Sequence, residues 1–211
     1  MIKDDQIYWV ALATFRPFGA VRLAKLMNGF ATMKQAFYAD AHELKQAGIE
    51  PELITRFLQE RTSIDPEALL NQLESQDIQV ITLKEERYPA LLKEIFDPPA
   101  LLFMRGSLPD PGKKYLAVVG SRKASSYGER VTEDLIAPIA RAGVVIVSGL
   151  AYGIDAGAHD AAIRAGGCTL AVLGSGVDQA SIYPSRHRTL ASRIISSNRS
   201  CVRTFLSNEC K

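Results

Sequence analysis

The sequence predicts an α/β protein in which an extended Rossmann-like parallel sheet follows a small all-helical module of the SAM-like or helix-hairpin-helix type. Three continuous apolar runs, at 116–120, 144–149 and 170–174, each end in glycine. Such runs are typical of strands covered on both faces, and helical stretches separate them, so a parallel sheet is expected. Residues 6–61 instead space their apolar groups at helical intervals.

The helical module contains two segments, 16–27 and 44–58, in which a glycine stands in a tight link before an apolar helix. Amides exposed at such hairpins can contact a DNA backbone. Residues 1–114 carry 14 basic against 16 acidic side chains, however, so packing or contact with a protein partner is favoured for this module.

A second domain is expected to begin near residue 73, where the apolar spacing changes. Residues 78–83 and 101–104 read as strands, and 88–95 as a short helix opened by a proline. A proline- and glycine-rich connection at 109–114 leads into the parallel sheet. The expected domains are a helical module at 1–72, an incomplete Rossmann-like domain at 73–195 and an atypical tail at 196–211.

Two helices are expected between the three sheet strands. The first, 127–141, should turn a stripe made of Val131, Leu135 and Ile139 toward the sheet. The second, 155–165, should bury three alanines, which are Ala158, Ala161 and Ala162.

The composition is that of a globular protein with a substantial core, because 47% of the residues are apolar. No signal-like segment opens the chain, and no apolar stretch reaches the roughly 18 residues of a spanning helix, so a cytoplasmic protein without membrane contact is expected. Three cysteines, Cys168, Cys201 and Cys210, lack metal-ligand spacing and predict neither a disulfide framework nor a zinc site. The net charge of +2 permits a polyanionic partner without requiring one.

Ligands of parallel sheets bind beyond the carboxyl ends of the strands, so the loops after the three runs are the candidate site. The first loop, 120–125, combines a glycine turn, hydroxyls, two cations and a helix start, a combination that suits phosphate. Arg122 is the strongest indication, because a guanidinium at a helix amino-terminus is unfavourable unless an anion is bound. The predicted phosphate or DNA contacts are Gly120, Ser121, Arg122, Lys123, Gly149, Tyr152, Gly174, Ser175, Arg186 and Arg188.

Structural interpretations compete with this site. Glycines such as Gly149 and Gly174 are common after parallel strands, and Tyr152 or Tyr183 could pack in place of stacking on a base. Asp155 is interpreted as a helix N-cap and His159 as an ordinary helix residue, since two ligands at i and i+4 make a poor metal site without a third.

Nucleotide enzymes are disfavoured by missing signatures. The sequence after the first strand, Gly120-Ser-Arg-Lys-Ala-Ser, is not G-x-G-x-x-G, and no G-x-x-x-x-G-K-[ST] loop exists. No serine or cysteine has a recognisable base and orienting group nearby, so no catalytic constellation, metal or cofactor is predicted.

Several motifs together resemble the DNA-processing protein A (DprA or Smf) family over residues 7–195. They are Tyr88-Pro-Ala-Leu-Leu, Pro98-Pro-Ala-Leu-Leu-Phe-Met-Arg-Gly, Val119-Gly-Ser-Arg, Ser148-Gly-Leu-Ala-Tyr-Gly-Ile-Asp-Ala-Gly-Ala-His and Leu173-Gly-Ser-Gly-Val-Asp. The resemblance implies a non-enzymatic protein that binds single-stranded DNA in a basic pocket and helps load a RecA-type recombinase during natural transformation. It also implies that Arg122 and the cations after Tyr183-Pro184 contact DNA.

The resemblance is expected to stop before the tail, where the family continues with a further strand and a dimer surface. Residues 196–211 show no such pattern, so a truncated or frame-shifted product is expected, and the family's homodimer is not assured. The alternatives are a Rossmann-like nucleotide phosphoribohydrolase, whose P-G-G-x-G-T signature is absent, and an inactive fragment.

Overall fold

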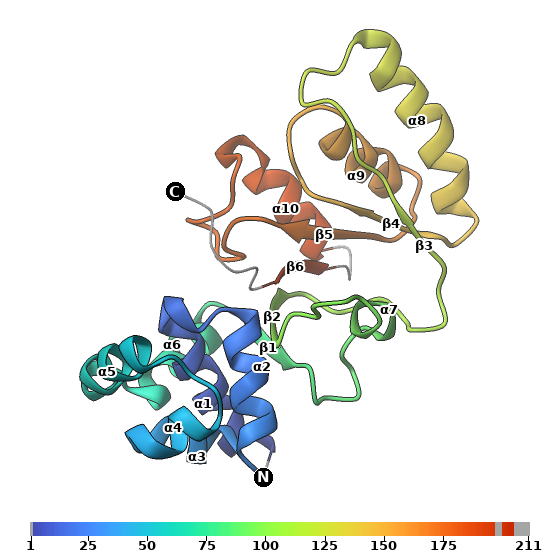
Figure 1. Cartoon of the computed structure of the whole chain (residues 1–211). Coiled ribbons are helices and arrows are strands. Elements are labelled where there is room, and N and C mark those ends of the chain that lie inside the picture. The colour runs from blue at the N-terminus through green and yellow to red at the C-terminus, as the bar shows by residue number, and fades with distance from the viewer. Residues whose placement is uncertain (1, 197–199, 205–211) are drawn as a thin grey trace. The chain divides into compact units, whose positions relative to one another are not determined.

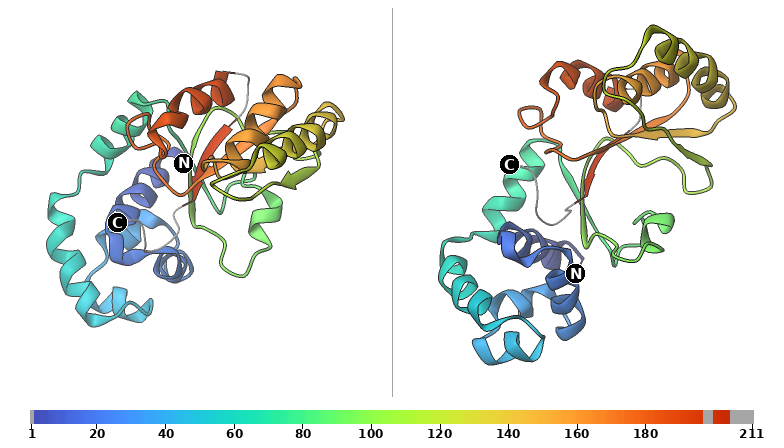
Figure 2. Two further views of the ribbon diagram at one scale, coloured as in Figure 1. Left: turned by 90° about the horizontal axis from the view of Figure 1, so that it is seen from above. Right: turned by 45° about the horizontal axis from the view of Figure 1, so that its top comes forward.

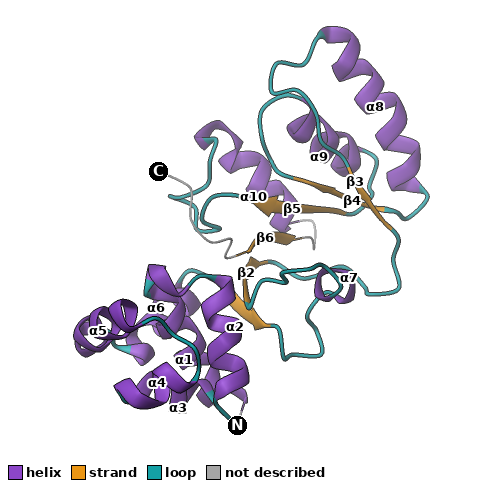
Figure 3. Cartoon of the chain, viewed as in Figure 1, coloured by secondary structure: helices purple, strands orange, loops and turns teal. Residues whose placement is uncertain are grey.

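The computed structural model describes residues 2–196 and 200–204. Contacts divide the chain after Leu102, within strand β2, into two compact units. The first is mainly helical, and the second alternates strands with helices (Figure 3). Units defined by contacts need not coincide with domains, so the domain limits expected at 72/73 and 195/196 stay a prediction.

The first unit begins with short helices whose ends are set by capping residues and prolines. The Asp40 carboxylate accepts from the Glu43 amide, Asp65 caps a second helix, and Pro51 and Pro66 open helices at positions where a missing N–H costs nothing. The elements are α1 (Ile2–Thr14), η1 (Arg16–Phe18), α2 (Ala20–Gly29), α3 (Met33–Tyr38), α4 (Ala41–Gln46), α5 (Pro51–Glu60), η2 (Arg61–Ser63), α6 (Pro66–Ser75), β1 (Gln79–Thr82), α7 (Ala90–Lys93) and the start of β2 (Leu101–Arg105).

An aromatic cluster forms the core of this helical unit. The Phe18 ring lies 4.7 Å from the rings of both Phe15 and Phe57, and Phe37 approaches Phe57 at 6.1 Å. Edge-on and tilted contacts of this kind stabilise beyond the area they bury. Because these rings come from η1, α3, α5 and the residue that follows α1, the cluster joins helices that are individually too short to be stable.

The second unit is a parallel α/β layer. Strand β3 pairs with β4, β4 with β5 and β5 with β6, all parallel, with Leu116, Ile146 and Thr169 in register. Each new strand lies beside the previous one, so right-handed connections place α8, α9 and α10 on one face of the strands (Figures 1 and 2). The predicted Rossmann-like α/β fold is confirmed. The elements are β3 (Tyr115–Ala117), α8 (Ser126–Arg141), β4 (Val145–Ser148), α9 (Ile154–Arg164), β5 (Thr169–Leu173), η3 (Ser185–His187), α10 (Arg188–Ser196) and β6 (Ser200–Thr204).

The predicted inward stripe of α8 is wrong at Leu135, although Ile139 of the same stripe packs partly buried against the core. Thr132, Ile136 and Ala140 are the buried side chains of this helix, whereas Leu135 is 58% exposed. The helix carries two adjacent apolar stripes. The stripe that contains Ile136 and Ala140 packs against α9 and Ile146. The expected burial of the three α9 alanines, Ala158, Ala161 and Ala162, is confirmed.

Among the described residues, no helix is both long enough and apolar enough to cross a membrane.

Candidate nucleic-acid interface

Residues Gly120–Lys123, called the phosphate turn below, follow β3 and are exposed. The Ser121 hydroxyl accepts from the Lys123 amide at 3.1 Å, and Ser125 caps α8 by accepting from the Gly128 amide at 3.2 Å. Within the part of the chain that the structure describes, the amides of Gly120, Ser121 and Arg122 donate to no protein group. Unbonded amides beside a helix amino-terminus can donate to a bound anion.

The second loop, Gly149–Gly153, packs directly against the phosphate turn. The Ile154 amide donates to the Ser121 carbonyl at 3.2 Å. Gly153 has φ +74°, and a β-carbon there would overlap the Ser121 carbonyl oxygen. A β-carbon at Gly120 would lie 2.7 Å from the Ile154 side chain. Glycine is therefore required at both positions for the two loops to approach each other.

Asp155 is not the N-cap of α9, contrary to the sequence interpretation. The cap position is Gly153, and Asp155 is the second residue of the helix, two positions after the cap. The buried Asp155 carboxylate accepts from the Gly149 amide at 3.1 Å, so it closes the second loop across its base. Its place in the first turn of α9 also favours the negative charge.

His159, which was interpreted as an ordinary helix residue, is fully buried. The Thr169 hydroxyl donates to the Ile146 carbonyl at 2.8 Å, so it accepts from Nδ1–H of His159 at 2.7 Å. Nε2 makes no hydrogen bond to any residue within the described part of the chain. Burial lowers the pKa of His159 to about 4 and keeps the ring neutral near pH 7. Thr169 is a polar residue at the start of an otherwise apolar strand, and this pattern could have predicted a polar contact there.

No group of three or more metal-ligating side chains lies within the described ranges 2–196 and 200–204.

The third loop, which follows β5, is closed by a hydrogen bond to Ser175. Its hydroxyl accepts from the Tyr183 amide at 3.1 Å, so Ser175 shapes the loop in this structure. Gly174 is exposed and faces open space, and the Tyr183 side chain is exposed as well. Gly174 and Tyr183 are therefore accessible to a ligand.

Arg186 of η3 and Arg188, the first residue of α10, differ in their surroundings. Arg186 is exposed and makes no ion pair with any residue that the structure describes. Arg188 donates to the Ala180 carbonyl at 2.5 Å, so its guanidinium supports its own loop. Arg186 is the cation that remains available to a ligand.

His187 connects α10 to the second loop. Its Nδ1–H donates to the Leu150 carbonyl at 2.8 Å, and its ring meets the Tyr152 ring edge-on at 5.0 Å. Together with the contact between Ile154 and Ser121, this contact joins the segments that contain the predicted site residues.

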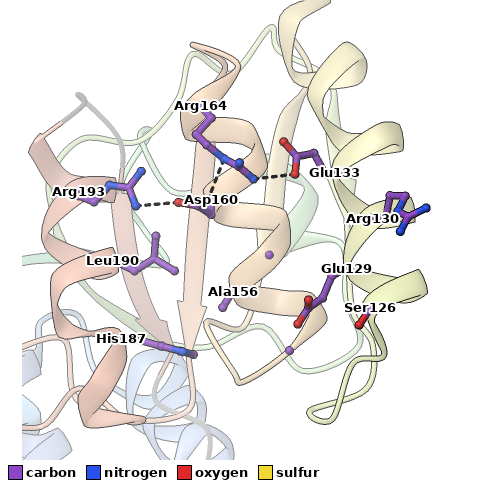
Figure 4. Close-up of a pocket in the computed structure, with 12 residues that line it drawn as sticks. Ser126, Glu129, Arg130, Glu133, Ala156, Asp160, Arg164, His187, Leu190 and Arg193 are labelled. Atoms are coloured by element: carbon purple, nitrogen blue, oxygen red, sulfur yellow. Dashed lines mark hydrogen bonds and ion pairs between the residues drawn. The ribbon is translucent and has the colours of Figure 1, made fainter.

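A groove of about 620 Å³ lies between α8, α9 and α10 (Figure 4). Arg164 pairs with Glu133 and Asp160, each at 3.0 Å, and Arg193 pairs with Asp160 at 2.7 Å. The lining holds three arginines, which are Arg130, Arg164 and Arg193, and three carboxylates, which are Glu129, Glu133 and Asp160, so the groove is not a cationic channel. Its lining also includes Gly153 and His187, which belong to the loop region described above.

The hairpin between α4 and α5 offers few free amides. Gly48 donates to Lys45 and Ile49 to Leu44. Glu50 sits at the same hairpin, where its hydrogen bonds to the Arg22 guanidinium lower its pKa to about 2. A carboxylate and internally bonded amides do not suit a DNA backbone, so this hairpin is left outside the interface.

Most of the chain matches the model of a known protein family. Residues 79–210 match the model of DNA recombination-mediator protein A. The chain belongs to this family. The match confirms the resemblance drawn from the motifs, and it extends beyond residue 195, so it does not support the expected end of the family pattern there.

Curated relatives are similar over nearly the whole chain. Protein Smf of Escherichia coli is 40% identical over 202 residues, which are 95% of this chain and 52% of the relative. Protein Smf of Synechocystis is 33% identical over 92% of this chain and 50% of its own length. The chain thus spans about half the length of these relatives.

The structure of DNA processing protein A from Streptococcus pneumoniae is also similar. Its TM-score is 0.64 at 28% identity, over 87% of this chain and 66% of that one. The likeness supports the fold of both units. Within the tail expected at 196–211, residues 200–204 form strand β6 and pair in parallel with β5, so the expectation that the family's further strand is missing there is wrong. Apart from these residues and residue 196, the tail lies outside the described residues.

Proposed function

We propose that this chain binds single-stranded DNA through the phosphate turn, without catalysis, in the uptake and recombination of DNA. The observation that carries the proposal is the phosphate turn itself, where free amides stand beside Arg122 and Lys123, and neither cation is paired with a described residue. The names of the family and of its relatives, which refer to DNA processing and recombination, agree with this chemistry.

The contacts favour a strand over a small nucleotide. Tyr152 and Tyr183 expose ring surface near the loops, and aromatic rings stack on bases of any sequence. Arg186 supplies a further unpaired cation on another loop. The proposal includes protection of the incoming strand and the loading of a RecA-type recombinase, as implied by the resemblance.

Titration of a fluorescent oligonucleotide at several salt concentrations tests the site. Arg122→Glu should weaken binding at least tenfold and reduce the slope of log affinity against log salt by about 0.7, the value of one phosphate contact on a single strand. The matched control is Arg141→Glu, which makes the same charge change at the other end of α8.

Equal affinities for wild type and Arg122→Glu would refute the site assignment. Release of a free base from a nucleoside monophosphate would instead favour the phosphoribohydrolase alternative.

A further inference from the structure

The second loop holds a backbone conformation that its sequence does not favour. Leu150 has φ +59°, in the left-handed region that non-glycine residues rarely occupy, and its side chain is fully buried. Such a residue persists only where its surroundings fix it in place.

Two side chains hold this loop in place by hydrogen bonds to its backbone. The Asp155 carboxylate accepts from the Gly149 amide at 3.1 Å, and Nδ1–H of His187 donates to the Leu150 carbonyl at 2.8 Å. Asp155 belongs to the helix that the loop leads into, whereas His187 is 37 residues away from Leu150 in the chain. The His187 bond is thus the long-range constraint on the strained residue.

His187 also fixes the direction of an aromatic ring. The Tyr152 ring meets the imidazole edge-on at 5.0 Å between centroids, at an angle of 67°. Tyr152 is 37% exposed, so one part of its ring packs on His187 and another part faces solvent. A base that stacks on Tyr152 would meet a ring that is already oriented.

The far end of the same loop supports the phosphate turn. Gly153 packs on the Ser121 carbonyl without room for a β-carbon, and the Ile154 amide donates to that carbonyl at 3.2 Å. A shift of the loop at Leu150 would therefore move Ser121 and the Arg122 that follows it.

We propose that His187 is a positioning residue for single-stranded DNA, which holds Leu150 and Tyr152 and, through Gly153, the phosphate turn, without itself binding a phosphate. This inference rests on the proposed function. The claim that His187 holds the second loop in place does not depend on DNA binding.

The test compares His187→Leu, which removes the donor, with His187→Asn, whose side-chain amide can donate from nearly the position of Nδ1. His187→Leu should weaken binding of a labelled oligonucleotide about tenfold, because one hydrogen bond that holds a strained loop is lost. The slope of log affinity against log salt should not change, because no phosphate contact is removed. His187→Asn should restore most of the affinity. His42→Leu, an imidazole removed from the helical unit, is the control and should bind like the wild type.

Hydrogen exchange without DNA supplies an independent measurement. The Gly149 and Ile154 amides, which are bonded to Asp155 and Ser121, should exchange several-fold faster in His187→Leu and near the wild-type rate in His187→Asn.

Three outcomes would overturn the inference. A salt slope that falls by about 0.7 in His187→Leu would make His187 a direct phosphate contact. Unchanged affinity would remove its role in binding, and unchanged exchange would remove its role in the loop. A wild type that binds no strand would refute the proposed function, while the exchange rates would still decide whether His187 holds the loop.

Discussion

Gly153 is the residue on which the phosphate turn rests, because its missing side chain lets the Ser121 carbonyl lie against its backbone. Gly153→Ala should therefore lower the free energy of unfolding by about 1–3 kcal/mol, the cost of a strained backbone, and displace the turn. Affinity for single-stranded DNA should fall at least tenfold. Denaturant unfolding and the oligonucleotide titration measure the two effects.

Gly166→Ala is the matched control for that substitution. Gly166 has a similar φ of +70°, but nothing lies within 4 Å of a β-carbon there. It should cost about 1 kcal/mol in stability and leave DNA affinity unchanged. Equal losses of affinity in the two variants would mean that general destabilisation, not the turn, weakens binding.

His159 should make the stability of the second unit depend on pH. Its folded pKa of about 4 lies below the ordinary 6.5, so between pH 6.5 and pH 4 the unfolded chain binds a proton that the folded chain does not. Stability should thus fall as pH drops through this window, by at most on the order of 3 kcal/mol.

The variant His159→Leu isolates this effect from that of the carboxylates. Its free energy of unfolding, measured with urea at pH 7, 5.5 and 4, should fall less steeply than that of the wild type. Parallel curves for the two proteins would contradict a neutral, buried imidazole at this position.

At the scale of the element, helix α8 offers a comparison between neighbouring residues. Ile136 is buried against α9, so Ile136→Ala should lower the free energy of unfolding by about 2–5 kcal/mol. Leu135 is largely exposed, and Leu135→Ala should change it by less than about 1 kcal/mol. Urea unfolding of both variants distinguishes the two faces, and a larger loss at Leu135 would support the stripe expected from spacing.

The elements were predictable because the apolar runs and the stretches between them differ in period. The orientation of α8 was not, because two apolar stripes lie side by side and the spacing of apolar residues cannot choose between them. The loops of the candidate site were also predictable, since parallel strands bring their carboxyl ends to one edge.

Side-chain partners within those loops were not predictable from the sequence. The bonds of His187 to Leu150 and of Arg188 to Ala180 depend on how loops distant in the chain meet. The pattern around Asp155 was compatible with an N-cap, and only the position of the Gly149 amide shows its other role.

At the scale of the whole molecule, basic side chains outnumber acidic ones in only part of the chain. Residues 1–114 carry 14 basic and 16 acidic side chains, and residues 115–195 carry 8 and 6. A nearly neutral surface supplies little non-specific attraction for a polyanion, so the unpaired cations of the interface should provide most of the electrostatic part of binding.

A shallow salt dependence should follow from this distribution. Three phosphate contacts, at Arg122, Lys123 and Arg186, give a slope of about −2 for log affinity against log salt, at −0.7 per contact. Replacing all three by glutamine should bring the slope close to zero. A wild-type slope steeper than about −4 would require further cations outside these loops.

A triple variant at the opposite edge of the sheet controls for net charge. Lys113, Lys114 and Arg141 precede β3 and β4, so their replacement by glutamine removes the same charge at the amino ends of the strands. This variant should keep the wild-type slope, because side chains that neutralise no phosphate release no counterions from the DNA. A fall in slope equal to that of the first triple variant would mean that net charge, not the placement of Arg122, Lys123 and Arg186, governs binding.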